Sequence, residues 1–430
     1  PNSLAVEAVD DYTLKIELQA PFASTLQVLA NGEFAAVPEG IVGDIKGYKG
    51  KMPYAKFASK KPIGAGPFTF ESWQQGTETS VTAYENYHGK GPKIDRVHWQ
   101  ILSNDNAVYN YAMNRNADIF TLPTAQYDPS KVSVERVDDK QRTHGTYGPL
   151  RNGETANYLA VPTLSVFYIG FNMPTVPTPV RKAVAYVLNQ QLAVEEVFKG
   201  RGRPAYHYMI PRVFPGTKNA AQKHAKSEYP YGYNKTRIDA ARKVMEKAGY
   251  GPDNPFELTL TLYKSKTWKR IAQNLRAKLA SAHVTLNIEQ ADFSTLLVRV
   301  QRLNVEAYSL GWIVPWASPS AFVKHLNPKT SDPQKGEPES YNAWPTSTQS
   351  AQRAIEAWQK IQSHPAPTES AERIRNEAAI TMEEANWQAV ANLPVYHEIT
   401  DRFWYDSVDI EPYGVGGYFR RKYNTVTLNK

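Results

Sequence analysis

The feature that most constrains this chain is a regular alternation of strand-length and helix-length segments between residues 239 and 312. Three of these segments show the alternating or short apolar runs that are typical of strands: 256–263, 284–289 and 306–312. Three others place apolar side chains at helical spacing: 239–248, 268–280 and 293–301. Strands that alternate with helices predict an α/β fold, with helices flanking a wound sheet.

A second constraint lies in residues 166–205, which open with the strand-length apolar run VFYIGF. The prolines within residues 172–179 exclude regular structure there. A helix is then predicted with Thr178 as its N-cap and Pro179 at its first position. One helix face is apolar and comprises Val180, Ala183, Val184, Val187 and Leu188. Gly200, Gly202 and Pro204 predict a turn after it.

The rest of the chain continues the mixture of strands and helices. Further strands are predicted at residues 4–18 (a hairpin), 68–73, 79–84, 94–102 and 393–397. Further helices are predicted at residues 105–114, 351–361 and 369–386. Residues 123–165 are polar and contain prolines, and no regular element is predicted for them.

Composition narrows the possible functions. The chain has no cysteine, which excludes a cysteine nucleophile, a disulfide framework and thiolate metal sites. Its net charge of +8 raises the question whether the protein binds nucleic acid. We interpret the lysines and arginines as spread along the chain, with the densest cluster at Arg420-Arg421-Lys422, and we predict no nucleic-acid partner. No apolar run approaches the roughly 20 residues that a membrane span needs.

Signals for catalysis or metal binding are weak, and we predict no enzyme, cofactor or metal. Glu383 and Glu384 are neighbours on a helix and point to different sides, and solvated helix charges explain them best. His397-Glu398 lies on a predicted strand and lacks the second histidine of a helical zinc motif. No G-x-S-x-G elbow is present.

Several segments together resemble a known family. The strand ending in Phe171-Asn172, the run VRKAVAYVLN and the G-x-G-x-P-A turn are similar to the solute-binding proteins of peptide-type ABC transporters. Residues 61–73 (KPIGAGPFTFESW) and 393–397 (LPVYH) match other parts of that pattern. Asn189-Gln190 stands where the family has Asp-Arg. The segment RFWYDSVDI most resembles archaeal, halophile-type members, although a basic net charge is the opposite of a halophilic surface.

The resemblance implies a two-lobed periplasmic-binding-protein-like fold of the class II type, with mixed sheets flanked by helices. We expect residues 1–165, completed by residues 403–430, to form the first lobe and residues 166–402 to form the second. The chain would cross between the lobes near Ser165 and Arg402, which makes a hinge of two crossings. Because family members carry the segment VEAVDDYTLKIEL well inside the chain, we also expect that an N-terminal part is missing.

The function that the resemblance implies is that of an extracytoplasmic receptor for an ABC importer. It would bind a peptide or similar small solute between two lobes, deliver it to the permease subunits, and meet the membrane only through the permease or a lost N-terminal lipoprotein-like anchor. Residues alone leave open whether the ligand is a peptide, a metal chelate or an oligosaccharide. Two alternatives are a surface or assembly protein without transport and, less favoured, a hydrolase.

Five residues form the predicted substrate-binding set, which is expected to face the space between the lobes: Tyr168, Asn172, Trp312, Trp316 and Tyr396. Aromatic rings would cover apolar ligand surface, while amide and hydroxyl groups would hydrogen-bond a peptide backbone. In the oligopeptide-binding members, an aspartate shortly after the Gly-Trp pair neutralises the peptide's amino terminus. Residues 313–319 contain no acid here. Either the N-terminal part that we expect to be missing supplies the acid, or the ligand lacks a free ammonium group. Core packing is the alternative role for Trp312 and Trp316.

Overall fold

The computed structural model describes residues 5–18, 21–36, 62–412 and 422–429. Lys61 of the segment 61–73, and Arg420 and Arg421 of the basic cluster, lie outside the described residues. Two compact units divide the chain. Unit 1 comprises Pro1–Val28, Leu164–Val197 and Arg203–His397, and unit 2 comprises Leu29–Thr163, Phe198–Gly202 and Glu398–Lys430.

Between residues 163 and 398 the chain therefore changes unit four times. The lobe boundaries expected near residues 165 and 402 stay a prediction.

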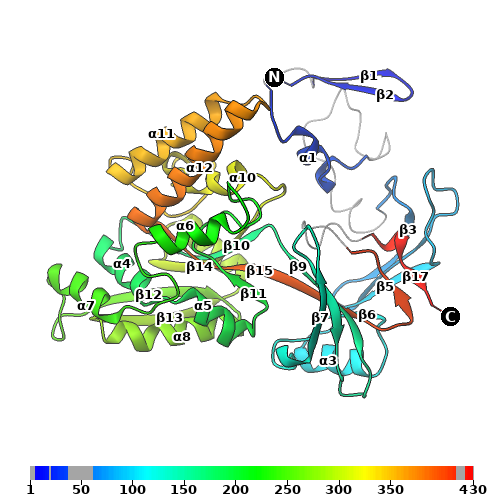
Figure 1. The fold of residues 1–430 in the computed structure, drawn as a ribbon, viewed down its shortest axis with the longest axis horizontal. Coiled ribbons are helices and arrows are strands. Elements are labelled where there is room, and N and C mark those ends of the chain that lie inside the picture. The colour runs from blue at the N-terminus through cyan, green and yellow to red at the C-terminus, as the bar shows by residue number, and fades with distance from the viewer. Residues whose placement is uncertain (1–4, 19–20, 37–61, 413–421, 430) are drawn as a thin grey trace. The chain divides into compact units, whose positions relative to one another are not determined.

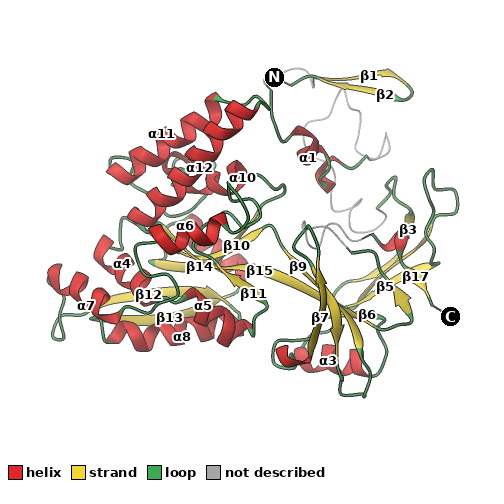
Figure 2. Cartoon of the chain, in the orientation of Figure 1, coloured by secondary structure: helices red, strands yellow, loops and turns green. Residues whose placement is uncertain are grey.

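Unit 1 holds most of the helices (Figure 2). Its strands are β1 (Val6–Asp10), β2 (Thr13–Ile16), β10 (Ser165–Phe171), β11 (Gly202–Pro204), β12 (Phe256–Tyr263), β13 (Val284–Ala291), β14 (Ala307–Ile313) and the first part of β15 (Asn392–Trp404). Its helices are α1 (Thr25–Leu29), α4 (Thr178–Val187), α5 (Gln190–Leu192), α6 (Ala220–Glu228), α7 (Ile238–Lys247), α8 (Lys266–Ala280), α9 (Phe293–Gln301), α10 (Pro319–Val323), α11 (Gln349–Ser363) and α12 (Glu369–Ala389). Short turns of other helix types are η3 (Ala193–Val197), η4 (Lys324–Leu326) and η5 (Pro328–Thr330).

The main sheet of unit 1 is mixed and has the strand order β13-β12-β14-β10-β15. Strand β12 runs parallel to β13 and β14, whereas β10 is antiparallel to β14 and β15. In Figure 1, α8 lies below this sheet, and α10, α11 and α12 lie above it. The predicted α/β class, with mixed sheets flanked by helices, is thereby confirmed.

Helix α4 shows how local sequence sets an element boundary. The helix begins at Thr178 and its N-cap is Pro177, so the prediction of Thr178 as N-cap is wrong by one residue. The Thr178 hydroxyl instead accepts a hydrogen bond from Arg181 Nη2 at 3.0 Å. The predicted apolar face of α4, from Val180 to Leu188, is buried as expected.

The buried guanidinium of Arg181 ties α4 to the end of α12. Its Nε and Nη2 donate to the carbonyl of Ala389, the last residue of α12, at 3.1 and 3.0 Å. Burial lowers the pKa of Arg181 to about 10, so the group remains charged at neutral pH. A cation at a helix C-terminus interacts favourably with the helix dipole, so Arg181 stabilises the packing of α12 on α4.

Unit 2 is built mainly from strands (Figure 2). They are β3 (Phe68–Gln74), β4 (Glu78–Ala83), β5 (Arg96–Gln100), β6 (Ile119–Phe120), β7 (Val132–Val137), β8 (Thr143–Tyr147), β9 (Ala156–Pro162), the last part of β15, β16 (Val408–Asp409) and β17 (Thr427–Leu428). Its helical elements are α3 (Asp105–Met113), η1 (Gly32–Phe34), η2 (Pro129–Lys131) and η7 (Tyr423–Thr425). Strands β7, β8 and β9 fall in residues 123–165, for which no element was predicted.

The core of unit 2 forms around Phe403 of β15. Its ring lies 5.1 Å from the ring of Tyr147, 5.3 Å from Tyr158 and 5.9 Å from Phe120. Phe403 is fully buried. These rings come from strands β6, β8, β9 and β15, so aromatic packing joins segments that lie far apart in the sequence.

The short segment 198–202 is anchored in unit 2 by an ion pair. Arg201 Nη2 lies 2.5 Å from Asp401 Oδ1, and Arg201 Nη1 donates to the Leu122 carbonyl at 2.9 Å. The Arg201 guanidinium also lies over the ring of Tyr127, 4.7 Å from its centroid. Asp401 is 3% exposed, so its charge depends on this partner.

Candidate functional site

The pairing of β10 with β14 decides which predicted site residues can meet. Val166 lies directly opposite Trp312, and Tyr168 lies directly opposite Leu310. Directly opposed side chains project from the same face of a sheet, and residues two apart on a strand share a face. Tyr168 and Trp312 therefore lie on one face of the unit 1 sheet.

His325, in η4, connects these two side chains. Its Nε2 lies 2.9 Å from the Tyr168 hydroxyl, and its ring stacks on the Trp312 ring at a centroid distance of 4.7 Å. Burial lowers the pKa of His325 to about 3, so the imidazole is neutral at physiological pH. The other side of this cluster is formed by Tyr208, whose ring stacks on His325 at 5.4 Å.

Trp312 is fixed in orientation but remains half-buried. Its indole Nε1 donates to the Ala321 carbonyl at 3.2 Å. Lys324 Nζ lies 5.3 Å from the indole centroid and forms an ion pair with Glu339 at 3.0 Å. The indole is thus held by contacts on several sides while part of its surface remains open.

Trp316 lies just beyond the end of β14 and is also half-buried. Its Nε1 donates to the Ser318 hydroxyl at 3.0 Å. Phe22 packs edge-on against its ring at 6.2 Å and is 44% exposed, and Ile313 at the strand end is 59% exposed. Phe22, Trp312 and Trp316, which we call the β14-end surface, expose apolar area in unit 1.

Asn172 and Tyr396 occupy different surroundings. Asn172 is 3% exposed, and its Nδ2 donates to the carbonyls of Leu303 and Val305 at 3.0 and 3.1 Å. Tyr396 is 6% exposed and lies opposite Phe167, on the sheet face away from Tyr168.

Tyr396 also shows why a glycine precedes Trp312. Its ring stacks on Phe167 at 4.6 Å with an interplanar angle of 1°. A Cβ built on Gly311 would lie 2.6 Å from the Phe167 ring, so glycine gives that ring its space.

The structure thus brings together Tyr168 and Trp312 and places Trp316 at the same strand end. Tyr396 lies on the opposite face of the sheet from these residues. The side-chain amide of Asn172 is hydrogen-bonded to two loop carbonyls. Ligand contact by the five residues stays a prediction. The half-buried pair Trp312 and Trp316 has free surface for a ligand, whereas Tyr168, Asn172 and Tyr396 are covered by protein atoms.

Glu383 and Glu384 do point to different sides of α12, but the expectation that both are solvated is wrong for Glu383. Its carboxylate is fully buried and accepts hydrogen bonds from the backbone N–H groups of Tyr208 and Met209 at 2.9 and 2.8 Å. Burial raises the pKa of Glu383 to about 7. Glu384 Oε1 instead lies 3.2 Å from His224 Nε2. Glu383 therefore fixes the loop that carries Tyr208, beneath His325.

The structure shows no catalytic geometry for His397-Glu398. His397 is buried on β15, and its Nδ1 lies 3.0 Å from the Ser165 carbonyl. Burial lowers the pKa of His397 to about 4. Within residues 5–18, 21–36, 62–412 and 422–429, no cluster of three or more histidine, aspartate or glutamate side chains is arranged to hold a metal ion.

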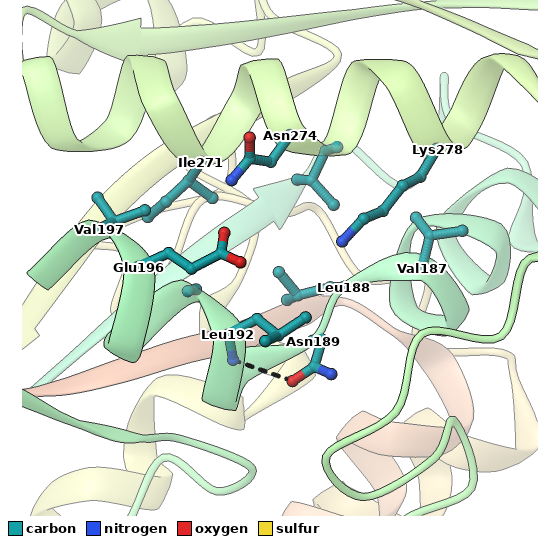
Figure 3. A pocket seen from close by; sticks show the side chains of 11 residues that line it. Val187, Leu188, Asn189, Leu192, Glu196, Val197, Ile271, Asn274 and Lys278 are labelled. Carbon is teal, nitrogen blue, oxygen red and sulfur yellow. Dashed lines mark hydrogen bonds between the residues drawn. The ribbon is translucent and has the colours of Figure 1, made fainter. Parts of the chain in front are cut away.

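A small crevice lies between the end of α4, η3 and α8 (Figure 3). Asn189, Glu196, Asn274 and Lys278 give it polar walls, and its volume is about 20 Å³. This is room for about one water molecule, so the crevice is too small for a peptide. Asn189 Oδ1 accepts from the Leu192 N–H at 3.1 Å and caps α5, so the family's Asp-to-Asn change keeps the helix start.

No helix in the described parts of the chain combines the length and the apolar character that a bilayer crossing requires.

Comparison with known proteins shows which family this chain resembles. The family model for bacterial extracellular solute-binding proteins, family 5 (middle), matches residues 1–334. The glutathione-binding protein GsiB of Salmonella paratyphi A is 24% identical over 346 residues, which are 76% of this chain and 59% of that protein. This chain therefore spans less than two thirds of that relative's length.

Solved structures share the fold. The ABC transporter substrate-binding protein CtaP from Listeria monocytogenes has a TM-score of 0.73 at 18% identity, covering 99% of this chain and 78% of that one. A dipeptide-binding protein from a Pseudoalteromonas species, solved with Met-Leu, has a TM-score of 0.70 at 16% identity, covering 99% and 75%. With the family match extending over most of the sequence, the chain belongs to the bacterial extracellular solute-binding proteins, family 5.

Proposed function

We propose that this chain is the substrate-binding receptor of an ABC importer and that it captures a peptide or a similar small solute outside the cytoplasm. The family match over residues 1–334 carries the proposal. The glutathione-binding relative and the dipeptide-binding structural neighbour support a peptide as the ligand class. Delivery to permease subunits, enclosure of the solute by two lobes and an extracytoplasmic location belong to the same proposal.

The β14-end surface is the part of unit 1 that we assign to ligand contact. Trp312 and Trp316 present indole surface, and Phe22 extends it. Flat aromatic rings bury apolar ligand groups with little loss of side-chain freedom. Tyr168 and His325 would support this surface from beneath, because they hold the Trp312 ring rather than contact solvent themselves.

The charges near this surface bear on the ligand's end groups. Residues 313–319 contain no acid, and the Glu339 carboxylate is already paired with Lys324. An ammonium group buried without a carboxylate would be costly. The β14-end surface therefore favours a ligand end that carries no free ammonium, unless another segment supplies an acid.

Isothermal titration calorimetry with matched peptides tests the proposal. The panel contains glutathione, the dipeptide Met-Leu, and both peptides with acetylated amino groups. Saturable binding of at least one peptide, with the peptide recovered intact, is the expected result. Absence of binding across the panel would contradict the peptide assignment and favour a surface or assembly role. Hydrolysis of a bound peptide would contradict the receptor assignment.

A further inference from the structure

The positive charge of this chain is concentrated in one segment. Residues 235–280 contain eleven lysines and arginines but only four aspartates and glutamates, whereas the whole chain has 50 and 42. The other 39 lysines and arginines are spread along the rest of the chain beside 38 aspartates and glutamates, so nearly all of the net charge of +8 comes from this segment. The segment forms α7, β12 and α8 of unit 1.

Helix α8 turns its cations outward. Its apolar side chains Trp268, Ile271, Leu275 and Leu279 are buried against the sheet. The opposite side exposes Lys266, Lys269, Arg270 and Arg276, while Lys278 is half-buried beside the crevice. No residue of α8 is acidic. The exposed side of α8, which we call the basic face, therefore carries positive charge along the whole helix.

Three cations of the basic face differ from two nearby cations in their pairing. Arg242 of α7 forms an ion pair with Asp239 at 3.3 Å, and Lys264 forms one with Asp292 at 3.0 Å. Among the residues that the structure describes, no acid lies within ion-pair distance of Lys269, Arg270 or Arg276. Like charges on one helix repel each other, so contact with a negatively charged partner would reduce this repulsion.

The neighbourhood of the basic face carries charges of both signs: Glu195 and Glu196 of η3, which packs against α8, are exposed, and so in part is Leu192 beside the crevice. Lys243, Glu246 and Lys247 are exposed on α7, which contacts α8. The exposed side of α8 holds no large apolar residue. A specific protein interface usually has an apolar or aromatic centre. A charged lipid surface needs only accessible cations, each worth roughly 1 kcal/mol near the bilayer.

We propose that the basic face of α8 is a contact surface for an anionic phospholipid bilayer. The helix is roughly 22 Å long at 1.5 Å per residue, so its cations can meet several headgroups at once. Because α8 exposes no large apolar side chain, the contact is electrostatic and reversible, and it weakens as salt screens the charges. Such a contact would keep the protein close to the bilayer independently of any ligand.

Vesicle sedimentation with two matched triple variants tests the proposal. The test variant is Lys269→Gln, Arg270→Gln and Arg276→Gln. The control variant is Lys218→Gln, Lys223→Gln and Lys226→Gln, which removes three exposed cations at and just before α6. Both variants lose the same charge. Each protein is mixed with vesicles of phosphatidylcholine alone or of phosphatidylcholine with an equal amount of phosphatidylglycerol, at low and high salt.

The wild type is expected to bind only the anionic vesicles, and to lose most of this binding at high salt. The test variant is expected to bind roughly 100-fold more weakly, because three surface cations are lost. The control variant should bind nearly as well as the wild type. Thermal unfolding of all three proteins checks that the exposed substitutions leave the fold intact. The comparison of wild-type binding at low and high salt tests the proposal without relying on any variant.

Three results would overturn the proposal. The first is no wild-type binding to anionic vesicles at low salt. The second is an equal loss in the test and control variants, which would mean that net charge alone matters. The third is binding of poly-glutamate without binding of vesicles, which would replace the lipid by an acidic protein surface.

Discussion

Replacement of Trp312 by alanine separates a ligand-contacting residue from a core residue. The indole is half-buried, stacks on His325 and donates one hydrogen bond to Ala321. A fully buried Trp-to-Ala change costs about 3–5 kcal/mol of unfolding free energy. Because part of the Trp312 surface is already exposed, we expect a smaller loss of about 2 kcal/mol. The loss of an aromatic ligand platform should also weaken binding by about 10- to 100-fold.

Trp268 supplies the matched comparison, since it is fully buried on α8 and packs behind Tyr396. Urea unfolding of Trp312→Ala, Trp268→Ala and the wild type gives the two stability losses. Calorimetric titration of the folded proteins with the bound peptide gives affinity per folded molecule. We expect Trp268→Ala to lose more stability and Trp312→Ala to lose more affinity. Our reasoning is refuted if Trp312→Ala is as unstable as Trp268→Ala and binds peptide as tightly as the wild type.

Two further predictions concern buried charges. Burial raises the pKa of Glu383 from 4.5 to about 7 in the folded protein. The contribution of this group to the free energy of unfolding is therefore complete below about pH 4.5 and is lost as the pH rises through 7. The total loss is about 3 kcal/mol. Glu383→Gln should abolish this pH dependence of urea unfolding; an unchanged profile would contradict it. Arg201→Ala should cost about 3–5 kcal/mol because Asp401 stays buried without its partner, and adding Asp401→Asn should restore part of the loss.

Much of the fold could be predicted because its elements follow local patterns. The alternation in residues 256–263 and the apolar face of residues 293–301 correspond to β12 and α9 at the same boundaries. The strands within residues 123–165 could not be predicted, because β7 has almost no buried side chain and its strand pattern is weak. Their formation depends on pairing with β8 and β9 and on packing around Phe403.

The candidate site was harder to predict because it depends on register. Phe167 and Tyr168 are sequence neighbours but face opposite sides of the sheet, which places Tyr396 away from Tyr168. A shift in the β10–β15 pairing between these two residues cannot be seen in the sequence. His325 was missed as well, because its contact with Tyr168 joins positions 157 residues apart. The placement of Trp312 and Trp316 around the end of a strand could be predicted, because the alternating pattern of residues 306–312 marks that strand; their contact with a ligand stays a prediction.

The central claim is that this protein holds a small solute and leaves it unchanged. Native mass spectrometry of protein purified under native conditions, followed by release and identification of bound small molecules, tests this claim most directly. We predict one peptide-like solute per chain, displaced by an added peptide that is itself recovered intact. Protein that carries no solute and takes up none from a peptide mixture, or that returns cleaved peptides, would contradict the claim.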